Sequence, residues 1–481
     1  QSRQGPPGST HARKEPGLAR RGPGFRERER RLVRGTVGKA LADLLPDEAI
    51  LGDTSLGSEV VGSGVSVPLV APVSESQVAE VLSRASQERW RVLPAGLGTW
   101  LEGGGRPEVD LVLSTRNLRD VESYEPADLT FSAGAGIPWM DLQKITRAHG
   151  QWLPLDPPGA EAGTLGGLAA VGVSGPLRQS YGAPRDHVLG VRVVSGDGRI
   201  LNWGGRVVKN VAGFDVTRLM LGSWGALGII TAVSARLFPV PEEDVTVLVR
   251  APRCEDLLSE ARGLATSPLP LSALELVDPA PAGGAALAIR LLGSGAQVME
   301  MEGRIQEDMG AERFEGAGPH SAVVLRGAES REFHRTLGRW EEGAGMVLRM
   351  SLLPSKLGSL VEEARALAQL MEASTESDAL GQLKPGSGRR GELDGWNSGG
   401  SRLSGHVGWG VLRFAVPKLP GDPGGSRALA KAMGELRSRL EAEGGSLTIS
   451  SAPRLLMEEV GAWGVHGPEL GLMRGLKAEF D

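Results

Sequence analysis

The stretch Pro94-Ala95-Gly96-Leu97-Gly98-Thr99 decides how the first half of this 481-residue chain is interpreted. It follows directly on Arg91-Val92-Leu93, which predicts a β-strand. Two glycines and a threonine hydroxyl after a strand allow consecutive backbone N–H groups to point into one concavity, an arrangement that suits a pyrophosphate. Taken alone, the loop is equally compatible with an ordinary turn.

A second glycine-rich block lies further along the chain, at Gly163-Thr164-Leu165-Gly166-Gly167. Thr164 is placed to cap a helix near 165–171, and we expect the N-terminus of that helix to face a phosphate or a carbonyl oxygen. Two glycines at a helix start lower its stability, which favours a close approach of a ligand or a chain segment. The block is flanked by Asp156-Pro157-Pro158, Ser174-Gly175 and Gly182.

A third block joins the loop 205–215 to Gly222-Ser223-Trp224-Gly225 and a β-branched stretch from Gly228. A tight glycine turn that enters such a strand presents backbone N–H and C=O groups to an adenine or ribose edge. Within the loop, Lys209 is a candidate for offsetting negative charge on a reduced cofactor. A solvated surface lysine is the competing interpretation.

These three blocks, in this order and spacing, resemble the FAD-binding domain of the vanillyl-alcohol oxidase/PCMH flavoprotein superfamily over about residues 68–241. The resemblance implies an FAD between two α+β subdomains, with a C-terminal cap over the isoalloxazine ring. It assigns the pyrophosphate to Gly96, Gly98 and Thr99, the flavin and pyrophosphate surroundings to Thr164, Gly166, Gly167, Gly175 and Asp186, and the adenosine side to Gly228 and Ile230. Neighbouring residues complete the predicted cofactor site: Pro94, Ala95, Leu97, Ser174, Gly182 and Val188.

Within the superfamily, the segment 204–230 is similar to the FAD-binding E subunits of bacterial glycolate oxidases. Trp224 and Ala226 stand where the paralogous D subunits have an acidic residue and a threonine. The stretches 346–352 and 471–481 are also similar to E subunits. The resemblance implies a part in the oxidation of glycolate to glyoxylate, with a paralogous FAD-binding catalytic subunit and an iron–sulfur subunit that receives the electrons.

Two features of the sequence qualify this resemblance. No His or Cys lies in 94–105, where relatives attach the flavin covalently, so we expect non-covalent FAD. The metal-binding histidines of related 2-hydroxyacid dehydrogenases have no visible counterpart, so no metal site is predicted. Arg349 is a candidate for binding the carboxylate of a 2-hydroxy acid, since a guanidinium forks onto a carboxylate; a structural ion pair is the alternative. The sequence names no general base.

Hydrophobic periodicity predicts an α+β fold, because hairpins are mixed among helices instead of following a regular βαβ series. Proline- and glycine-rich, apolar-poor composition at the N-terminus predicts disorder there. The expected organisation is a disordered basic tail (1–35), a PCMH-type FAD-binding domain (36–241) with subdomains at about 60–150 and 151–241, and an α+β cap domain (242–481) with a flexible insertion (374–405).

Composition excludes several classes of protein. The formal net charge of -5 argues against nucleic-acid binding, and there is no apolar run of about 18 residues to span a bilayer. A single cysteine, Cys254, excludes an internal disulfide and an iron–sulfur cluster held by this chain's own thiolates. We expect a cytoplasmic protein, peripheral to the inner membrane at most through its partners.

Three functions remain open from the sequence. The first is an FAD-binding subunit of a glycolate-oxidising complex; the second is a self-sufficient FAD-dependent D-2-hydroxyacid (D-lactate) dehydrogenase. The third is a non-catalytic subunit that carries FAD for assembly. A nicotinamide-binding Rossmann enzyme is disfavoured, because Gly134-Ala135-Gly136 is followed by Ile-Pro-Trp and not by a third glycine at the required spacing.

Overall fold

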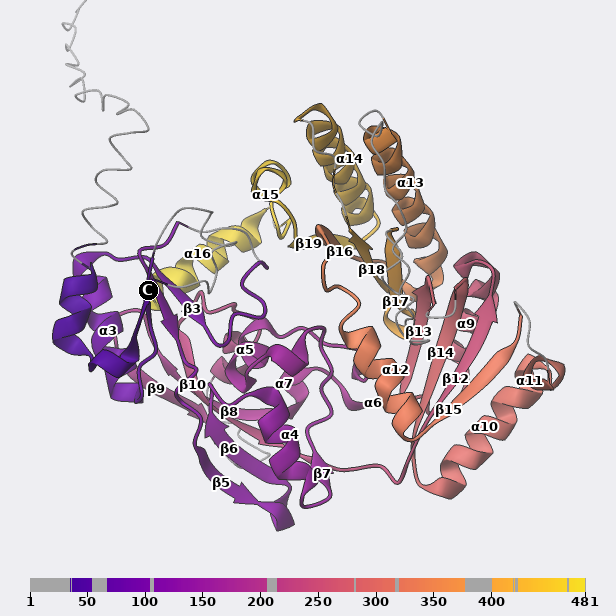
Figure 1. The fold of residues 1–481 in the computed structure, drawn as a ribbon, viewed down its shortest axis with the longest axis horizontal. Coiled ribbons are helices and arrows are strands. Elements are labelled where there is room, and N and C mark those ends of the chain that lie inside the picture. The colour runs from indigo at the N-terminus through magenta and orange to yellow at the C-terminus, as the bar shows by residue number, and fades with distance from the viewer. Residues whose placement is uncertain are drawn as a thin grey trace, which may run out of the picture.

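The structure is a computed structural model that describes residues 35, 37–53, 67–103, 108–205, 214–280, 283–315, 320–376, 400–417, 419, 423–464 and 467–480. The predicted basic tail, apart from Gly35, and the candidate Lys209 lie outside these residues. Figure 1 shows two bodies side by side, an N-terminal module (residues 37–241) built from more than one sheet and a cap (residues 242–451) built from one sheet, each with its helices. The predicted α+β fold class is confirmed.

The first sheet of the N-terminal module places the loop that begins at Gly96. Its strand order is β1-β2-β4-β3, with β4 parallel to both β2 and β3. Helix α3 covers it with Val78, Val81, Leu82 and Ala85. The helix is capped at its start, because the Gln77 N–H donates to Ser74 Oγ at 3.3 Å and the Val73 N–H donates to Gln77 Oε1 at 2.9 Å. The elements are β1 (Ile50–Asp53), β2 (Pro68–Val70), α3 (Glu75–Glu88), β3 (Val92–Ala95) and β4 (Leu111–Ser114).

The second sheet of this module is antiparallel, with the order β5-β6-β10-β8-β9. Strands β5 and β6 therefore belong with strands beyond residue 188, and the expected subdomain division at about residue 150 is wrong. The pairing of β6 with β10 causes this, and periodicity within one strand carries no information on its distant partner. The strands are β5 (Val121–Glu125), β6 (Thr130–Gly134), β8 (Val188–Val194), β9 (Ile200–Gly204) and β10 (Ile229–Arg236).

Short elements surround these sheets. Helix α4 buries Trp139, Leu142, Gln143 and Thr146, whereas Ile145 is exposed. Helix α5 has the bounds that its threonine cap predicts. The remaining elements are α4 (Trp139–Arg147), β7 (Gln151–Trp152), α5 (Leu165–Val171), α6 (Arg178–Tyr181), α7 (Pro184–His187), α8 (Val216–Met220) and β11 (Phe238–Pro239).

The cap is built from two βαββαβ units, which share one eight-stranded antiparallel sheet in the order β15-β12-β14-β13-β17-β18-β16-β19. Each unit has the same internal order, and the units join by pairing β13 with β17. The first unit is β12 (Glu243–Ala251), α9 (Leu258–Thr266), β13 (Ala273–Asp278), β14 (Ala285–Gly293), α10 (Gly295–Met309) and β15 (Ala322–Arg326). The second is β16 (Met346–Ser351), α13 (Leu357–Glu376), β17 (Arg402–His406), β18 (Val411–Val416), α14 (Pro423–Ala442) and β19 (Ser446–Ser451).

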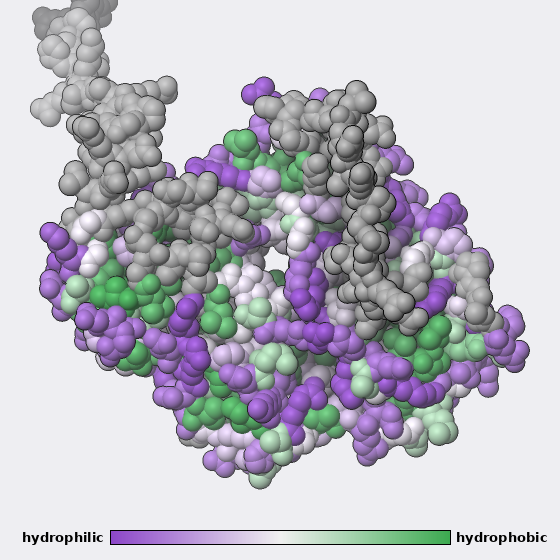
Figure 2. All heavy atoms as spheres, in the orientation of Figure 1, coloured by the Kyte–Doolittle hydropathy of each residue, from purple (hydrophilic) through white to green (hydrophobic). Residues whose placement is uncertain are grey.

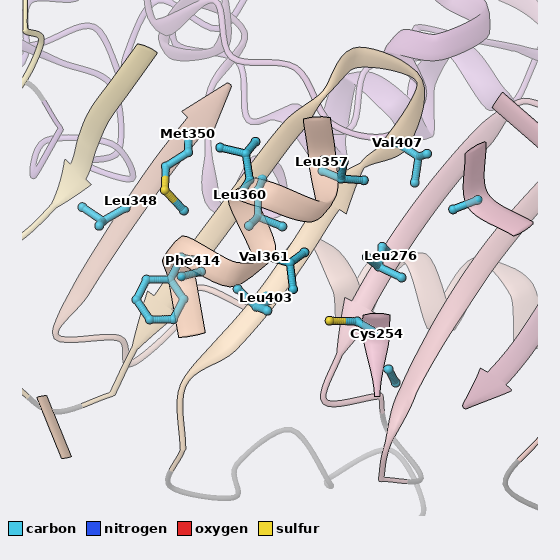
Figure 3. Packing of buried hydrophobic residues seen from close by; sticks show 14 of the residues in the cluster. Cys254, Leu276, Leu348, Met350, Leu357, Leu360, Val361, Leu403, Val407 and Phe414 are labelled. Atoms are coloured by element: carbon cyan, nitrogen blue, oxygen red, sulfur yellow. The ribbon is translucent and has the colours of Figure 1, made fainter. Parts of the chain in front are cut away.

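One face of the cap sheet packs against helices α9, α10, α13 and α14. Figure 3 shows this core in the second unit, where Leu348, Phe414 and Leu403 of the sheet meet Leu360 and Val361 of α13. Because side chains alternate along a strand, every second residue must then point to the opposite face. That opposite face carries the polar side chains of the cap sheet.

The opposite face, called the polar face below, carries charged and hydroxyl side chains that are nonetheless buried. It also packs α12 (Ala328–Gly338) against β12 and β15. Among its buried polar members, Thr246 and Ser404 are fully buried and Glu275 is 1% exposed. Buried charges are costly unless they are paired, so this face is built for a specific arrangement of charge. The buried polar members on its strands are Asp244, Thr246, Glu275, Arg290, Arg402, Ser404 and Arg413.

The expected flexible insertion at 374–405 is partly wrong. Helix α13 extends to Glu376, and strand β17, which starts at Arg402, lies in the middle of the cap sheet. Residues 377–399 lie outside the described residues. The strand was missed because Arg402-Leu403-Ser404-Gly405-His406 has no β-branched residue and follows a run of glycine and serine.

The C-terminal segment returns to the N-terminal module, although we assigned it to the cap. After α15 (Arg454–Val460), helix α16 (Pro468–Phe480) crosses the module, as Figure 1 shows in yellow. The Gly196 N–H donates to the Phe480 carbonyl at 2.7 Å, and the Phe480 ring meets Trp203 edge to face. None of the helices in the described part of the chain is both long and apolar enough to cross a membrane.

Candidate functional site

The structure brings together the three glycine-rich blocks in the N-terminal module. A Cβ on Gly96 of the first block would lie 2.3 Å from Thr164 Oγ1 of the second. A Cβ on Gly225 of the third block would lie 2.8 Å from Pro94 Cγ, and Gly172 and Gly222 approach as closely. These contacts require glycine, and they form one continuous cradle from loops that are far apart in sequence.

The loop after β3 offers free backbone donors. Pro94 and Ala95 belong to the strand, so the loop begins at Gly96. Within the described part of the chain, the N–H groups of residues 96–99 donate no hydrogen bond, and Gly98 has a φ of 95°. The Thr99 hydroxyl instead donates to the Ala162 carbonyl at 2.6 Å, which fixes the loop to the second block. Four consecutive free donors in a half-buried loop fit a pyrophosphate.

The start of α5 differs from what we expected. The N–H groups of Leu165 and Gly166 donate to the carbonyls of Ile137 and Ala135, and Gly167 N–H donates to Thr164 Oγ1 at 3.1 Å. The N–H groups of these three residues are thus used within the chain and are not free to bind a phosphate. Gly166 is needed for close packing, since a Cβ there would lie 2.5 Å from the Ala135 Cβ.

Two buried hydroxyls mark the other wall of the cradle. The Oγ atoms of Ser174 and Ser223 are buried without a hydrogen-bond partner in the described part of the chain. Gly175 packs on Asp156, whose carboxylate accepts the Leu177 N–H at 3.1 Å. Desolvation raises the pKa of Asp156 to about 7. Ser174 directly precedes Gly175, so an unpaired buried hydroxyl lies one residue from the contact with Asp156, an arrangement that fits the polar edge of a bound cofactor.

The remaining predicted cofactor residues lie around this cradle. The Asp186 carboxylate accepts the Ala183 N–H at 2.8 Å, so it caps the short helix α7, while Gly182 supplies a turn with a φ of 90°. Val188 begins β8, and Ile230 is buried in the adjacent strand β10. Gly228, with a φ of 142°, leads into β10. Their assignment to FAD stays a prediction.

Arg349 lies on the polar face of the cap, in β16. Across the sheet it is opposite Arg413, and on the other side opposite Thr448. Burial lowers the pKa of Arg349, and the nearby Arg178 and Arg413 lower it further. Among the described residues, no carboxylate forms an ion pair with Arg349, whereas Arg413 is paired with Glu341 at 3.0 Å. A half-buried guanidinium without an acidic partner is suited to bind an anion.

The sequence did not indicate a second feature of the polar face, which is a histidine held by a carboxylate. Nδ1 of His406 is hydrogen-bonded to Oε1 of Glu275, on the neighbouring strand β13. The two residues are 131 positions apart, and only the pairing of β13 with β17 reveals their contact. In the described part of the chain, no three His, Cys, Asp or Glu side chains gather to hold a metal ion.

The polar face meets the N-terminal module through α6. The Arg178 guanidinium lies 4.4 Å from the centre of the Trp409 ring, just beyond β17, and the Ser180 hydroxyl donates to the Ser272 carbonyl. Asp156, in the cradle, is near enough to the cap for Arg290 and Glu275 to influence its pKa. Figure 2 shows a hollow between the two bodies in the middle of this view. The cradle and the polar face thus border a shared region.

Comparison with known proteins finds a family match for part of the N-terminal module. Residues 68–204 match the model of the FAD binding domain family. The chain is 40% identical over 176 residues to glycolate oxidase subunit GlcE of Escherichia coli, covering 36% of this chain and 50% of that protein. It is 32% identical over 218 residues to a mitochondrial D-lactate dehydrogenase [cytochrome] of Arabidopsis thaliana, covering 44% of this chain and 38% of that protein.

The fold of nearly the whole chain has a solved counterpart. Alkyldihydroxyacetonephosphate synthase superimposes with a TM-score of 0.63 over 93% of this chain and 83% of that one, at 16% sequence identity. This likeness concerns the fold alone. The chain spans half or less of the length of these sequence relatives. The family match and the open donors of the cradle agree, and residues 68–204 form an FAD-binding domain of the PCMH type.

Proposed function

We propose that this chain is an FAD-dependent oxidoreductase that acts on a small 2-hydroxy acid such as glycolate. It works as one subunit of a complex with a paralogous flavoprotein and an iron–sulfur subunit. The observation that carries the proposal is Arg349, a half-buried guanidinium without an acidic partner among the described residues, on the cap face that meets the cradle. Sequence relatives named as glycolate oxidase subunits and D-lactate dehydrogenases support this substrate class.

In this proposal the N-terminal module binds the cofactor and the cap binds the substrate. The loop 96–99, with Ser174 and Ser223, would hold non-covalent FAD, which supplies a two-electron acceptor when bound. Arg349 would bind the substrate carboxylate, and it stays protonated because an arginine keeps its charge even with a lowered pKa. Arg178 and Arg413 add positive potential to the same region, which attracts a small anionic acid.

Substitution of Arg349 tests the proposal. Arg349→Met removes the guanidinium and keeps the length of the side chain, so we expect KM for glycolate to rise by about 100-fold, the weight of a charge-assisted hydrogen-bond pair. The measurement is reduction of the bound flavin by glycolate and by D-lactate without oxygen. Arg339→Met is the matched control, because Arg339 is exposed and paired with Glu342. An unchanged KM in the Arg349 variant would contradict the proposal.

The subunit role needs a separate experiment. The purified chain and its assembly with the paralogous and iron–sulfur subunits are compared for glycolate-driven flavin reduction and for electron transfer to a dye. We expect the assembly to pass electrons onward and the chain alone to fail to do so. Full turnover with D-lactate by the chain alone would favour a self-sufficient dehydrogenase. Fast reduction of this flavin while the paralogous subunit is inactivated would exclude a purely structural role.

A further inference from the structure

A buried carboxylate holds the imidazole of His406 in a fixed position. Glu275 and His406 stand directly opposite each other on β13 and β17, the strands that join the two cap units. Glu275 accepts a hydrogen bond from His406 through Oε1 and one from the Ser404 hydroxyl, at 3.3 Å, through Oε2. Because Glu275 is 1% exposed, these bonds replace solvent and fix the orientation of the carboxylate.

This contact decides which nitrogen of His406 is available. A carboxylate only accepts hydrogen bonds, so Nδ1 carries the proton and Nε2 of the neutral ring keeps its lone pair. Among the described residues, no group is hydrogen-bonded to Nε2, and the side chain is 12% exposed. Nε2 is therefore an acceptor that a ligand can use.

His406 lies where the cap meets the cradle. It ends β17, and the turn Val407–Trp409 that follows packs on α6 of the N-terminal module. Arg178 stacks on Trp409, and a Cβ on Gly408 would lie 3.3 Å from the Gln179 amide oxygen. Helix α6 comes directly after the segment 175–177 that packs on Asp156. The imidazole thus borders the region next to the flavin cradle.

Arg349 and His406 share this region. Arg349 is opposite Arg413, and Arg413 is opposite Ser404, two residues before His406 on the same face. Arg349 and His406 are therefore two strand spacings of about 4.8 Å apart across the sheet and two residues of about 3.4 Å apart along it. Their Cα atoms are thus about 12 Å apart. Arg178, whose positive charge lowers the pKa of Arg349, also stacks on Trp409, three residues after His406. A small acid fits between a guanidinium and an imidazole that approach from these positions.

We infer that Nε2 of His406 accepts a hydrogen bond from the hydroxyl group of the 2-hydroxy acid whose carboxylate Arg349 binds. Glu275 is the positioning residue that presents this nitrogen. The inference rests on the proposed function and adds a specificity determinant to it. An acid without the 2-hydroxyl leaves Nε2 without a donor in a partly buried site, so the site selects hydroxy acids over plain carboxylates.

The test compares glycolate with acetate, which has the same carboxylate and no hydroxyl. Calorimetric titration of the purified, FAD-loaded chain should show about tenfold tighter binding of glycolate, the effect of one hydrogen bond. His406→Phe should abolish this preference and leave acetate binding unchanged. The exposed His320→Phe is the matched control and should keep the preference. A His406→Phe protein that still prefers glycolate overturns the inference.

A spectroscopic readout tests the same contact without relying on a substitution at His406. Nitrogen NMR of the histidine rings should show Nδ1 protonated in the free protein, and glycolate should shift the Nε2 resonance more than acetate does. Glu275→Gln should leave a mixture of ring tautomers and reduce the glycolate shift, while Glu362→Gln, on helix α13, should not. Equal shifts with the two acids in the unsubstituted protein also overturn the inference.

The design separates the two proposals. If Arg349→Met abolishes binding of both acids but the hydroxyl preference does not depend on His406, the inference on His406 fails and the proposed function stands. If neither acid binds in a manner that depends on Arg349, the proposed function itself fails. Far-UV circular dichroism and flavin content of each variant verify that the protein is folded.

Discussion

Burial of His187, at the end of α7, links the stability of the molecule to pH. The side chain has no exposed surface, and desolvation lowers the pKa of its imidazole to about 4. An unfolded histidine titrates near 6.5, so between these two values only the unfolded chain takes up the proton. The free energy of unfolding must therefore fall as the pH decreases from about 6.5 to about 4, by about 3 kcal/mol at most.

Replacement of His187 by Phe should remove this part of the pH dependence. The variant loses the titrating group and keeps a ring in the space beside Phe238. Urea unfolding at a series of pH values from about 7 to about 4.5 measures the slope, and the exposed His149→Phe serves as the control. The explanation fails if the His187 variant loses stability with acid as steeply as the unsubstituted protein.

At the scale of elements, the contact between the loop after β3 and the start of α5 forms the cradle. Gly96→Ala would place a methyl group 2.3 Å from Thr164 Oγ1, on a residue that is 1% exposed and caps α5. Overpacking of this kind costs about 1–3 kcal/mol. We expect the variant to be destabilised by that amount and to bind FAD at least about tenfold more weakly, as measured by flavin retention during dialysis.

A double-mutant cycle isolates this contact. Thr164→Ala removes both atoms nearest to the added methyl group, so Gly96→Ala should cost less in the Thr164→Ala background than in the unsubstituted chain. Gly205→Ala is the control, because no atom of the described residues lies within 4 Å of its Cβ position. Additive effects of the two substitutions would show that the clash with Thr164 is not the cause.

Helix α5 could be predicted from its sequence, whereas the cap strand β17 could not. The bounds of α5 follow from the Thr164 cap and from Gly172, which ends the helix with a φ of 66°. Capping residues such as these lie next to the helix in the sequence, so they can be recognised without the fold. Strand β17 has no such signal, because it is short, lacks β-branched residues and is stabilised by pairing with β13 and β18.

Some features of the candidate site could likewise be predicted from the sequence, and others could not. Its glycine loops were predictable, since tight turns and close backbone approaches require glycine wherever they occur. The use of the α5 donors within the chain was not, because their acceptors at Ala135 and Ile137 lie about 30 positions earlier and are ordinary backbone carbonyls. Arg349 could be proposed from sequence, but its lack of an acidic partner among the described residues is a property of the folded sheet.

For the whole molecule, α6 is one of the contacts that join the cap to the N-terminal module, together with the hydrogen bond from the Gly159 N–H to the Gly338 carbonyl. Arg178→Ala removes the stack on Trp409, a cation–π contact worth about 1 kcal/mol. We expect amide hydrogen exchange to become about fivefold faster in the turn Val407–Trp409 and in α6, and to stay unchanged in α3. Arg304→Ala, at the exposed pair with Glu300 on helix α10, should change neither. Equal exchange rates in the Arg178 variant and the unsubstituted protein would show that this stack does not tie the bodies together.

The paired βαββαβ units of the cap also bear on how the chain is made. Strand β13 would be an open sheet edge in the first unit alone, and β17 would be one in the second; each covers the other only when both exist. A nascent or truncated chain that ends before β17 therefore exposes the unpaired backbone of β13, a template for aggregation. During synthesis, β13 therefore stays unpaired until β17 has been made, unless a chaperone covers it, and the first unit can aggregate in that interval.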